Sequence, residues 1–480
     1  MQDFKKSVVY QIYPKSFLDT NGDGLGELRG VTSKLDYLKE LGADYIWLTP
    51  FFVSPQNDNG YDVADYRTID PRYGTMEDFE ELARQAERRG IRLMLDMVFN
   101  HTSTEHVWFQ KALAGDPVYQ DYYIFRPARP DGSVPTTWQS KFGGSAWEYA
   151  PQVGKYYLHL FDKTQADLNW ENPAVRREVQ QIVHFWMDKG VKGFRFDVVN
   201  LISKGEYADD ELGDGHRFYT DGPRIHEFLQ ELNRESFGQD PEIVTVGEMS
   251  STSMENCFRY AGADCGELSM VFSFHHLKVD FMGNEKWVIV PADFGRLKEL
   301  LFSWQEGMAA HNAWNAVFWC NHDQPRVVSR LKIHARDNSR TPTQWTDGEN
   351  GGFTTRTPWI GVNPNTSRIN AASQVEDPDS IFAYYKALIR LRKEYDVFAY
   401  GDFAPVDQTH PSVLSYRREY KGQSLLCVNN FYRAACNWRC PVSLESYRML
   451  LSNYSDSTPA AHWALRPYES VLLIREADDT

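Results

Sequence analysis

Four short segments of the sequence place charged and hydrogen-bonding residues where apolar runs of strand length end. They are DMVFNH (96–101), GFRFD (193–197), VTVGE (244–248) and CNHD (320–323). The carboxyl ends of parallel strands meet on one face of a barrel, so these segments predict an active site with several carboxylates on that face. A single Asp or Glu in such a place is more often a helix cap or a solvated charge, whereas four such ends in register favour a shared site.

The elements that must position these residues follow an alternation of apolar strand-length runs and stretches of helical period, which is typical of a parallel sheet covered by helices. One amphipathic helix begins after Thr75, a predicted N-cap with Asp78 three residues on, and ends near Gly90. The predicted strands cover residues 8–13, 45–49, 91–98, 193–199, 243–247, 268–274 and 316–321.

The predicted fold class is α/β, a (β/α)8 TIM-type barrel. Seven strands are found where a closed barrel requires eight, because residues 328–374 offer no buried strand. We expect the barrel to comprise residues 1–101 and 170–398. Residues 102–169, rich in Trp, Tyr, Gly and Pro, are too long for an ordinary connection and predict an inserted subdomain B. Residues 399–480 alternate apolar and polar side chains and predict a C-terminal β-sandwich.

Composition excludes several classes of partner. The 480 residues carry a formal net charge of −15, which argues against nonspecific binding of nucleic acid or of an anionic membrane. We find no secretory signal and no apolar run long enough to span a membrane. The six cysteines are scattered without a Cys-x-x-Cys pair, as expected of reduced thiols, and the predicted location is the cytoplasm. The oligomeric state is not predicted.

Five motifs occur in the order found in one known family. DMVFNH (96–101), QADLN (165–169), GFRFD (193–197), VGE (246–248) and NHD (321–323) resemble the short motifs of the α-amylase family, glycoside hydrolase family 13, over nearly the whole chain. The resemblance implies a retaining glycosidase with no catalytic cofactor. It implies Asp197 as nucleophile, Glu248 as general acid and then base, and Asp323 as stabiliser of the oxocarbenium-like transition state, in agreement with the two carboxyl groups that glycoside hydrolysis requires.

Further residues are expected to bind the sugar. Arg195 lies two residues before Asp197 on a strand, so both side chains face the same way and Arg195 would keep Asp197 ionised. By resemblance, Tyr61 is an aromatic platform for the sugar, and His101 and His322 bind hydroxyl groups of the sugar. A single histidine is more often structural. The predicted substrate-binding residues are Asp58, Tyr61, His101, Phe161, Gln165, Arg195, His322 and Arg336.

Within the family, RDNSRTP (336–342), GEMSSTS (247–253) and FHHLKVD (274–280) resemble the trehalose-6-phosphate hydrolases most closely and the oligo-1,6-glucosidases next. The resemblance implies a phosphorylated disaccharide as substrate. Lys278, Lys286, His275, His276 and Lys204 are candidates for binding its phosphate, the alternative being solvated lysines beside helix ends. Two other functions stay open: an oligo-1,6-glucosidase or other α-glucosidase, and a noncatalytic sugar-binding or transport-accessory protein on the same barrel.

A loop after the first predicted strand has the oxygen-rich start of a calcium-binding loop. It reads DTNGDGLGE (19–27), but Gly30 stands where an EF-hand has its bidentate Glu. The resemblance implies instead a single structural Ca²⁺ held by Asp19, Asn21, Asp23, Leu25 and Glu27. The alternative is an Asp-Gly turn without a metal.

The sequence departs from the family at one place. Only residues 324–335 separate the NHD motif from the RDNSRTP stretch, where family members carry the seventh helix, the eighth strand and a loop over the site. The strand count and the motif spacing therefore indicate the same missing segment. We expect it to leave strand edges of the barrel exposed.

Overall fold

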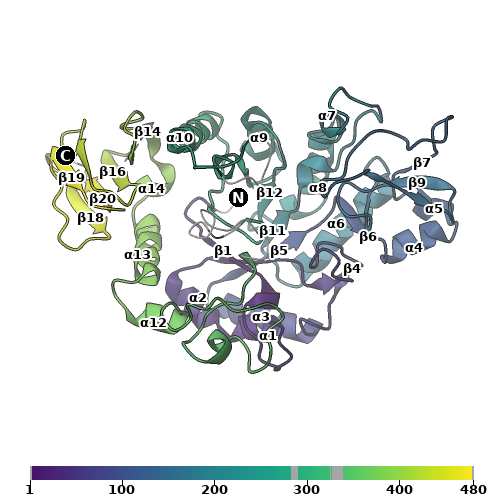
Figure 1. Cartoon of the computed structure of the whole chain (residues 1–480), viewed down its shortest axis with the longest axis horizontal. Helices are drawn as coiled ribbons and strands as arrows, with labels where there is room; N and C mark the ends of the chain where they lie inside the picture. Colours follow the sequence, from purple (N-terminus) through teal and green to yellow (C-terminus); the bar gives the residue numbers. More distant parts are fainter. Residues whose placement is uncertain (1–2, 283–289, 325, 327–338, 478–480) are drawn as a thin grey trace.

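The computed structural model describes residues 3–282, 290–324, 326 and 339–477. Its centre is a sheet of six parallel strands, which Figure 1 shows between an inserted lobe and a C-terminal lobe. In spatial order the strands are β1 (Val9–Ile12), β2 (Tyr45–Leu48), β5 (Arg92–Met97), β11 (Gly193–Phe196), β12 (Val244–Glu248) and β13 (Met270–Phe272). All residues of β2, β11, β12 and β13 are buried, as expected of strands covered on both faces.

The helices that cover the sheet begin and end where local signals predict. Thr75 and Asp78 form a reciprocal capping box at the start of α3, and Gly42 ends α2 with a φ of 100°, a conformation that glycine adopts without strain. The helices of the barrel are α1 (Leu28–Ser33), α2 (Leu35–Leu41), α3 (Met76–Arg88), α6 (Pro173–Asp188), α7 (His216–Tyr219), α8 (Ile225–Glu235), α9 (Met254–Ala261) and α10 (Phe294–Ala310).

The insertion after the third strand of the barrel forms its own small lobe, seen at the right of Figure 1. A short antiparallel pair, β6 with β10, joins it to the barrel at the register Asp167 to His101. Its elements are β6 (His101–Ser103), α4 (Val107–Leu113), α5 (Pro117–Gln120), β7 (Phe125–Arg126), β8 (Trp147–Ala150), β9 (Lys155–Leu158) and β10 (Gln165–Asp167). A second pair, β3 (Phe52–Val53) with β4 (Asp65–Ile69), lies in the loop after β2.

The seventh strand, expected over residues 316–321, is not formed. Asn315 makes only an isolated parallel bridge to Val271, supported by a hydrogen bond from the Ala316 amide to the Val271 carbonyl. β1 and β13 are consequently the two edges of the parallel sheet among the described residues. The run meets β13 at this single bridge and has no strand on its other side among the described residues, so it does not pair as a strand and the prediction was wrong.

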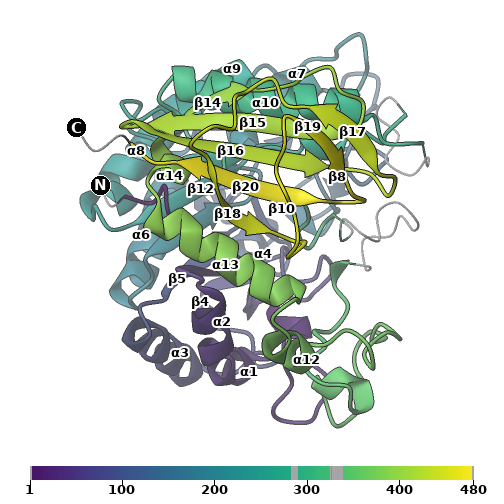
Figure 2. The ribbon, with the colours of Figure 1, turned by 90° about the vertical axis from the view of Figure 1, so that its left-hand side faces the viewer.

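The C-terminal lobe pairs a five-stranded antiparallel sheet with a two-stranded one. The larger sheet has the order β14 (Asp402–Pro405), β15 (Val413–Tyr420), β16 (Gln423–Asn430), β20 (Ser470–Arg475), β18 (Arg448–Ser452), and the smaller pairs β17 (Cys436–Arg439) with β19 (His462–Leu465). A buried core that includes Val428, Trp438 and Leu465 joins side chains of the two sheets. Figure 2 shows the larger sheet above α13 (Ile381–Glu394), which follows α12 (Ala371–Glu376) and precedes α14 (Val397–Tyr400).

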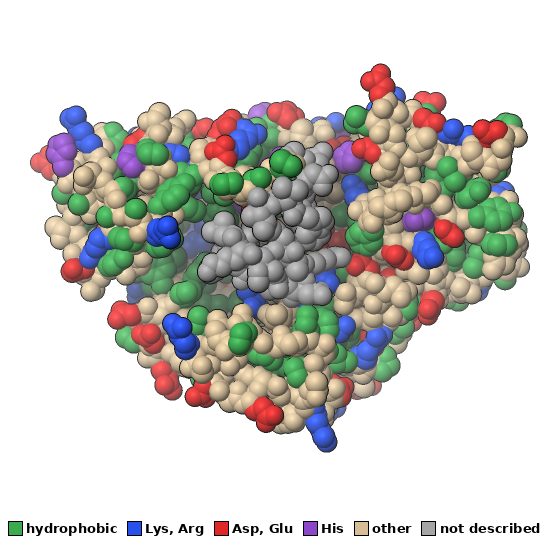
Figure 3. All heavy atoms as spheres, viewed as in Figure 1, with side chains coloured by type: hydrophobic (Ala, Val, Ile, Leu, Met, Phe, Trp, Pro, Cys, Tyr) green, Lys and Arg blue, Asp and Glu red, His purple; other side chains and the backbone are tan. Residues whose placement is uncertain are grey.

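Within residues 3–282, 290–324 and 339–477, no helix is both long and apolar enough to cross a bilayer. Acidic and basic side chains are interspersed over the described part of the face in Figure 3.

Candidate active site

The strand register brings the predicted acidic and basic groups together at the carboxyl end of the sheet. Arg195 in β11 lies opposite Asp96 in β5 and opposite Val246 in β12. Asp197 directly follows β11, and Glu248 is the last residue of β12. Residues two apart on a strand face the same side, so Arg195 and Asp197 project together toward Glu248.

Arg195 is the electrostatic centre of this group. Its guanidinium is fully buried and contacts three carboxylates: Nη1 lies 2.5 Å from Asp96 Oδ1 and 2.7 Å from Asp197 Oδ1, and Nη2 contacts Glu248 Oε2. One buried cation facing several carboxylates stays charged, and the surrounding carboxylates hold the pKa of Arg195 well above its usual range. Arg195 therefore orients the carboxyl groups of Asp197 and Glu248 while remaining behind them.

Asp197 and Glu248 have different environments. Burial raises the pKa of the Glu248 carboxyl well above its usual range; the Arg195 charge opposes this, and the Asp197 and Asp323 charges add to it. A carboxyl group that stays protonated near neutral pH is suited to act as a general acid. The backbone after Asp197 also contacts Glu248. Val198 has a left-handed φ of 35° and donates its N–H to Glu248 Oε2 at 3.3 Å.

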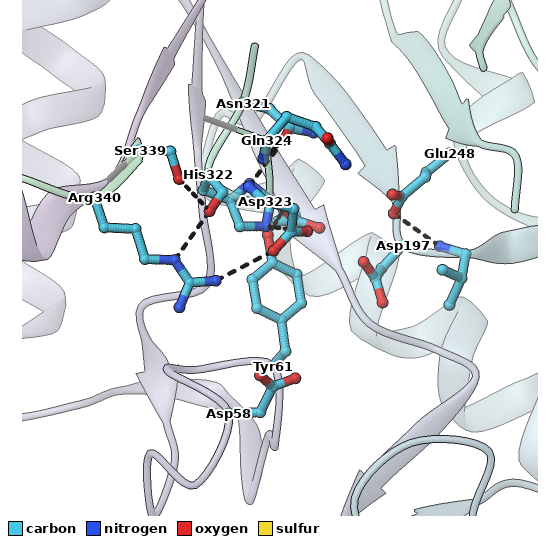
Figure 4. Close-up of polar contacts among 12 residues, drawn as sticks. Asp58, Tyr61, Asp197, Glu248, Asn321, His322, Asp323, Gln324, Ser339 and Arg340 are labelled. Carbon is cyan, nitrogen blue, oxygen red and sulfur yellow. Dashed lines mark hydrogen bonds and ion pairs between the residues drawn. The ribbon is translucent and has the colours of Figure 1, made fainter. Parts of the chain in front are cut away.

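A third group, on the segment after the expected seventh strand, faces this pair across the site (Figure 4). His322 Nε2 lies 3.1 Å from Asp323 Oδ2, and Arg340 Nη2 lies 3.2 Å from Asp323 Oδ1. Arg340 also donates through Nε to the His322 carbonyl at 3.0 Å and is buried. Asp323 thus lies between a histidine and an arginine.

The remaining sugar-binding candidates lie around Tyr61. Its ring stacks on the His322 ring with a centroid distance of 5.0 Å and an angle of 3°, and its hydroxyl donates to Asp96 at 2.8 Å. His101 Nε2 lies 3.1 Å from the Tyr61 carbonyl and 3.1 Å from Gln165 Nε2. Gln165 donates to Asp58 Oδ2 at 3.1 Å. Gln165 is fully buried, so its place is behind Asp58 and His101.

A cavity of about 500 Å³ opens onto these groups. The predicted residues that line it come from the barrel, the inserted lobe and the loop after β13: Asp58, Tyr61, His101, Phe161, Asp197, Glu248, Lys278 and Asp323. This volume falls in the range of pockets that enclose small organic ligands. Arg336 and Lys286 lie outside the described residues, so their predicted roles stay predictions.

The structure brings one of the other phosphate candidates, Lys278, to the cavity and directs three away from it. The Lys204 ammonium contacts Asp167 Oδ2, Asn100 Oδ1 and the Leu201 carbonyl at 2.8, 2.8 and 2.5 Å, which uses its three donors. His276 donates through Nε2 to the Phe318 carbonyl at 2.6 Å. His275 packs on Trp304, and burial with the nearby Lys278 lowers its pKa to about 4, so it carries no charge near neutral pH.

Three residues of the site were missed. Lys141, in the inserted lobe, lines the cavity with Lys278, and burial together with the Lys278 charge lowers its pKa to about 8. No sequence signal marks it. Gln11 in β1 contacts His322 Nδ1 at 2.8 Å and was detectable as a polar residue in an apolar strand. Arg340, which lies in the same stretch as Arg336, contacts Asp323 Oδ1 through Nη2 at 3.2 Å.

The predicted calcium loop is a compact turn built on its own carboxylates. Asp19 accepts hydrogen bonds from the Gly22 and Gly24 amides at 2.6 and 2.8 Å. Glu27 accepts from Thr20 through Oε1, while its buried Oε2 has no hydrogen-bond partner. Within the described residues, no three His, Cys, Asp or Glu side chains converge as a ligand set. The free Glu27 oxygen and the Asn21, Asp23 and Leu25 oxygens are nevertheless the hard donors that Ca²⁺ binds.

Comparison with known proteins identifies the class to which this fold and site belong. The model of the alpha amylase catalytic domain matches residues 11–335 and 331–401, and the chain belongs to the alpha-amylase family. It is 46% identical to a trehalose-6-phosphate hydrolase of Bacillus subtilis, over 98% of this chain and 97% of that protein. It is 40% identical to an oligo-1,6-glucosidase of Bacillus cereus, over 98% and 99%. The crystal structure of a Bacillus licheniformis trehalose-6-phosphate hydrolase matches with a TM-score of 0.95 and 45% identity, over 98% and 99%.

The comparisons also locate the missing segment. The alignment to the Bacillus subtilis protein spans 547 positions and 98% of a 480-residue chain, that is about 470 residues, so about 77 positions have no residue in this chain. The family model matches in two stretches that meet at residues 331–335. The chain therefore lacks, at this point, residues that its relatives have.

Restoring those residues is expected to stabilise the protein. The change is to insert, within residues 325–338, the segment of the Bacillus subtilis protein that this chain lacks. We expect the free energy of unfolding to rise by about 3 to 6 kcal/mol, because a strand that buries two or three aliphatic side chains contributes about that much. Covering the sheet edges should also reduce aggregation. Denaturant unfolding and light scattering measure both effects. A Gly-Ser insert of equal length is the control, and equal stability of the two insertions would contradict the prediction.

Proposed function

We propose that the chain is a retaining α-glucosidase that hydrolyses α,α-trehalose 6-phosphate to glucose and glucose 6-phosphate. The observation that carries the proposal is a single cavity lined by Asp197, Glu248 and Asp323 and also by the two lysines Lys141 and Lys278. The carboxylates supply glycoside hydrolysis, and the lysines supply cations for a phosphate in a protein that is otherwise acidic. Similarity to trehalose-6-phosphate hydrolases over nearly the whole chain supports the same substrate.

The reaction follows from the two carboxyl environments. The Asp197 carboxylate attacks the anomeric carbon and forms a covalent glucosyl ester, while the bond from that carbon to the bridging oxygen breaks. Glu248, whose pKa burial raises, gives its proton to that oxygen, and the phosphorylated sugar leaves. Glu248, now a carboxylate, removes a proton from the water that attacks the ester, and glucose is released. Asp323 stabilises the positive charge that develops on the sugar, and Arg195 stabilises the negative charge of the carboxylates in these steps.

Ser250 and Ser251, which directly follow the acid strand, line the same cavity as Lys141 and Lys278. The general acid protonates the oxygen of the departing sugar, so the residues that follow Glu248 are expected to surround that sugar. We therefore place the phosphate of the leaving glucose 6-phosphate between the two lysines. Tyr61, His101, Asp58 and His322 would then hold the glucose that becomes attached to Asp197, with Phe161 beside His101.

The main alternative, an oligo-1,6-glucosidase, differs in having no need for cations in the cavity. Replacing Lys141 or Lys278 by Ala is expected to lower kcat/KM for trehalose 6-phosphate about 10- to 100-fold, since a hydrogen bond to a charged group contributes about 1.5–3 kcal/mol. Turnover of isomaltose by the same variants should change less than about 3-fold. Steady-state kinetics on both substrates test this, with Lys155→Ala, an exposed lysine of the inserted lobe, as the matched control.

The pH dependence gives a second readout of the same variants. Since the pKa of Lys141 is about 8, its charge is lost as pH rises through that value, and the ratio of kcat/KM for trehalose 6-phosphate to that for isomaltose should fall there. In Lys141→Ala this step should be absent. Equal losses on both sugars in the lysine variants would contradict the phosphate assignment and favour the oligo-1,6-glucosidase. A noncatalytic binding protein would bind the sugars without turnover, a result that the retained nucleophile and acid argue against.

We further propose that a Ca²⁺ ion binds the loop of residues 19–27 through Asp19, Asn21, Asp23, Leu25 and Glu27, with a structural and not a catalytic role. Saturating Ca²⁺ is expected to raise the free energy of unfolding by about 2.7 kcal/mol at a concentration 100 times its Kd, and a chelator should remove this gain. In Glu27→Gln the gain should largely disappear, while stability in chelator should not fall, because burial raises the pKa of Glu27 and its ionised form is costly. Thermal melts with and without Ca²⁺ compare the unaltered chain with Glu27→Gln. If Ca²⁺ does not shift the melting temperature of the unaltered chain, the proposed site is refuted.

The proposed location is the cytoplasm. All six cysteines are free thiols in the structure, which supports a reducing compartment. The proposed partner is the small sugar substrate.

A further inference from the structure

We propose that Asp221 is a positioning residue that ties the loop after the general acid Glu248 to the loop after the nucleophile Asp197. The roles of these two carboxyl groups are those of the proposed function, on which this proposal rests. Asp221 lies between α7 and α8 and is not among the described residues that line the cavity. It would therefore act through its neighbours and not by contact with the sugar.

The Asp221 carboxylate is saturated with hydrogen bonds. Oδ1 accepts from Asn200 Nδ2 at 3.1 Å and from the Tyr260 hydroxyl at 2.6 Å. Oδ2 accepts from the Thr252 hydroxyl at 2.6 Å and from Asn256 Nδ2 at 2.8 Å. These four donors occupy about all the acceptor positions of a carboxylate. They come from the segment after Asp197, from the loop after Glu248 and from α9.

Asn200 continues the connection to the acid loop. It lies in the 3-10 turn of residues Val199–Leu201 that follows the nucleophile and is fully buried. Its side-chain amide pairs in both directions with the Ser250 backbone, donating to the carbonyl and accepting from the N–H, each at 2.9 Å. The Asp221 amide donates to the Asn200 carbonyl at 2.9 Å. Asp221 thus holds the side chain that holds Ser250.

Both tied loops form the wall of the cavity. Val198 lines it and donates its N–H to Glu248, and Ser250 and Ser251 line it beyond the acid. Ser251 has a left-handed φ of 56°, a conformation that a serine keeps only when its neighbours hold it. Asp221, Asn200 and Thr252 provide that support from behind the wall.

Loosening the wall should change the titration of the acid. The charged groups that face Glu248 are Arg195, Asp197 and Asp323, and burial is the main cause of its raised pKa. If the loop after Glu248 moves, water enters beside the carboxyl group and its pKa falls toward the ordinary value. The charge of Asp221 itself acts on groups outside the cavity lining, namely Tyr260, Cys257 and His216.

The experiment compares Asp221→Asn and Thr252→Val with the unaltered full chain over a range of pH, using trehalose 6-phosphate and an aryl α-glucoside whose leaving group must be protonated. In Asp221→Asn the new side-chain N–H faces a group that donated a hydrogen bond to the carboxylate. That hydrogen bond is lost, and the connection between the two loops breaks. We expect kcat to fall about 10- to 100-fold on both substrates, the scale of a small misplacement of catalytic groups, and the alkaline limb of kcat/KM to move down by about one pH unit. Thr252→Val should shift the limb in the same direction by less.

Asp240→Asn is the matched control, because Asp240 is also a partly buried, hydrogen-bonded aspartate, paired with Lys192 away from the cavity; its pH profile should be unchanged. An unshifted alkaline limb in Asp221→Asn and Thr252→Val, with turnover lost only in proportion to unfolded protein, would overturn the proposal. If Asp221→Asn does not fold, the proposal is tested by whether the alkaline limb of kcat/KM shifts in Thr252→Val. Aryl-glucoside turnover without hydrolysis of trehalose 6-phosphate would refute the proposed substrate and leave the comparison of limbs valid.

Discussion

Asp197→Asn is expected to lower kcat on trehalose 6-phosphate at least about 10⁴-fold, the scale seen when a covalent nucleophile is removed. A neutral amide cannot form the glucosyl ester, and the water that replaces it is neither positioned nor charged. Steady-state kinetics, with denaturant unfolding to confirm the fold, measure the effect. The variant should retain substrate binding, because the sugar contacts proposed for Tyr61, His101 and His322 are unaltered.

Glu248→Gln separates the acid from the nucleophile. We expect a loss of about 10²- to 10⁴-fold on trehalose 6-phosphate, the usual contribution of general acid–base catalysis. With an aryl glucoside whose leaving group needs no proton, the first step should be almost normal and the covalent intermediate should accumulate on Asp197. If Asp197→Asn and Glu248→Gln respond alike to the two leaving groups, the assigned roles are wrong.

Arg195→Met is expected to have a large effect on both stability and turnover. It leaves Asp96, Asp197 and Glu248 without their buried cation, and removing one partner of a buried ion pair costs about 3–5 kcal/mol of unfolding free energy. It should also lower kcat about 10²- to 10³-fold, as the loss of a preorganised electrostatic contact does. Denaturant unfolding and kinetics measure the two effects on the same sample.

The sign of the accompanying pH shift is fixed by the structure. Arg195 lowers the pKa of Glu248 against the effect of burial, so without Arg195 that pKa rises further. Because the acid must be protonated, the alkaline limb of residual activity should move to higher pH, opposite to the shift expected for Asp221→Asn. Arg195→Lys keeps a charge without the two-pronged geometry of arginine. Its alkaline limb should lie between those of the unaltered chain and Arg195→Met. A downward shift in Arg195→Met would contradict the assignment of Glu248.

The convergence of Arg195, Asp197 and Glu248 at one end of the sheet could be predicted from the sequence because it depends on short-range rules. Arg195 and Asp197 face the same way because they are two residues apart on one strand, and parallel pairing aligns β5, β11 and β12 at their carboxyl ends. The cap at Thr75 and the end of α2 at Gly42 are likewise local. Elements defined by their own residues and their immediate partners were therefore placed correctly.

Contacts between distant segments could not be predicted. Lys204 looked like a free cation after a strand, but its ion pair with Asp167 crosses from the barrel to the inserted lobe. Lys141 reaches the cavity only through the path of an irregular insertion. The strand expected over residues 316–321 has the right composition, but a strand forms only if a neighbour pairs with it, and the segment that its relatives have next to it is missing from the chain.

The central claim is that this site hydrolyses a phosphorylated disaccharide. The most direct test is kcat/KM of the purified unaltered chain for trehalose 6-phosphate beside isomaltose and trehalose, with Asp197→Asn as the blank. The proposed function predicts turnover that depends on Asp197 and is at least about 10-fold greater for the phosphorylated sugar than for either neutral one, the difference that one charge-assisted contact provides. Equal or greater turnover of isomaltose, or turnover that persists in Asp197→Asn, would contradict it.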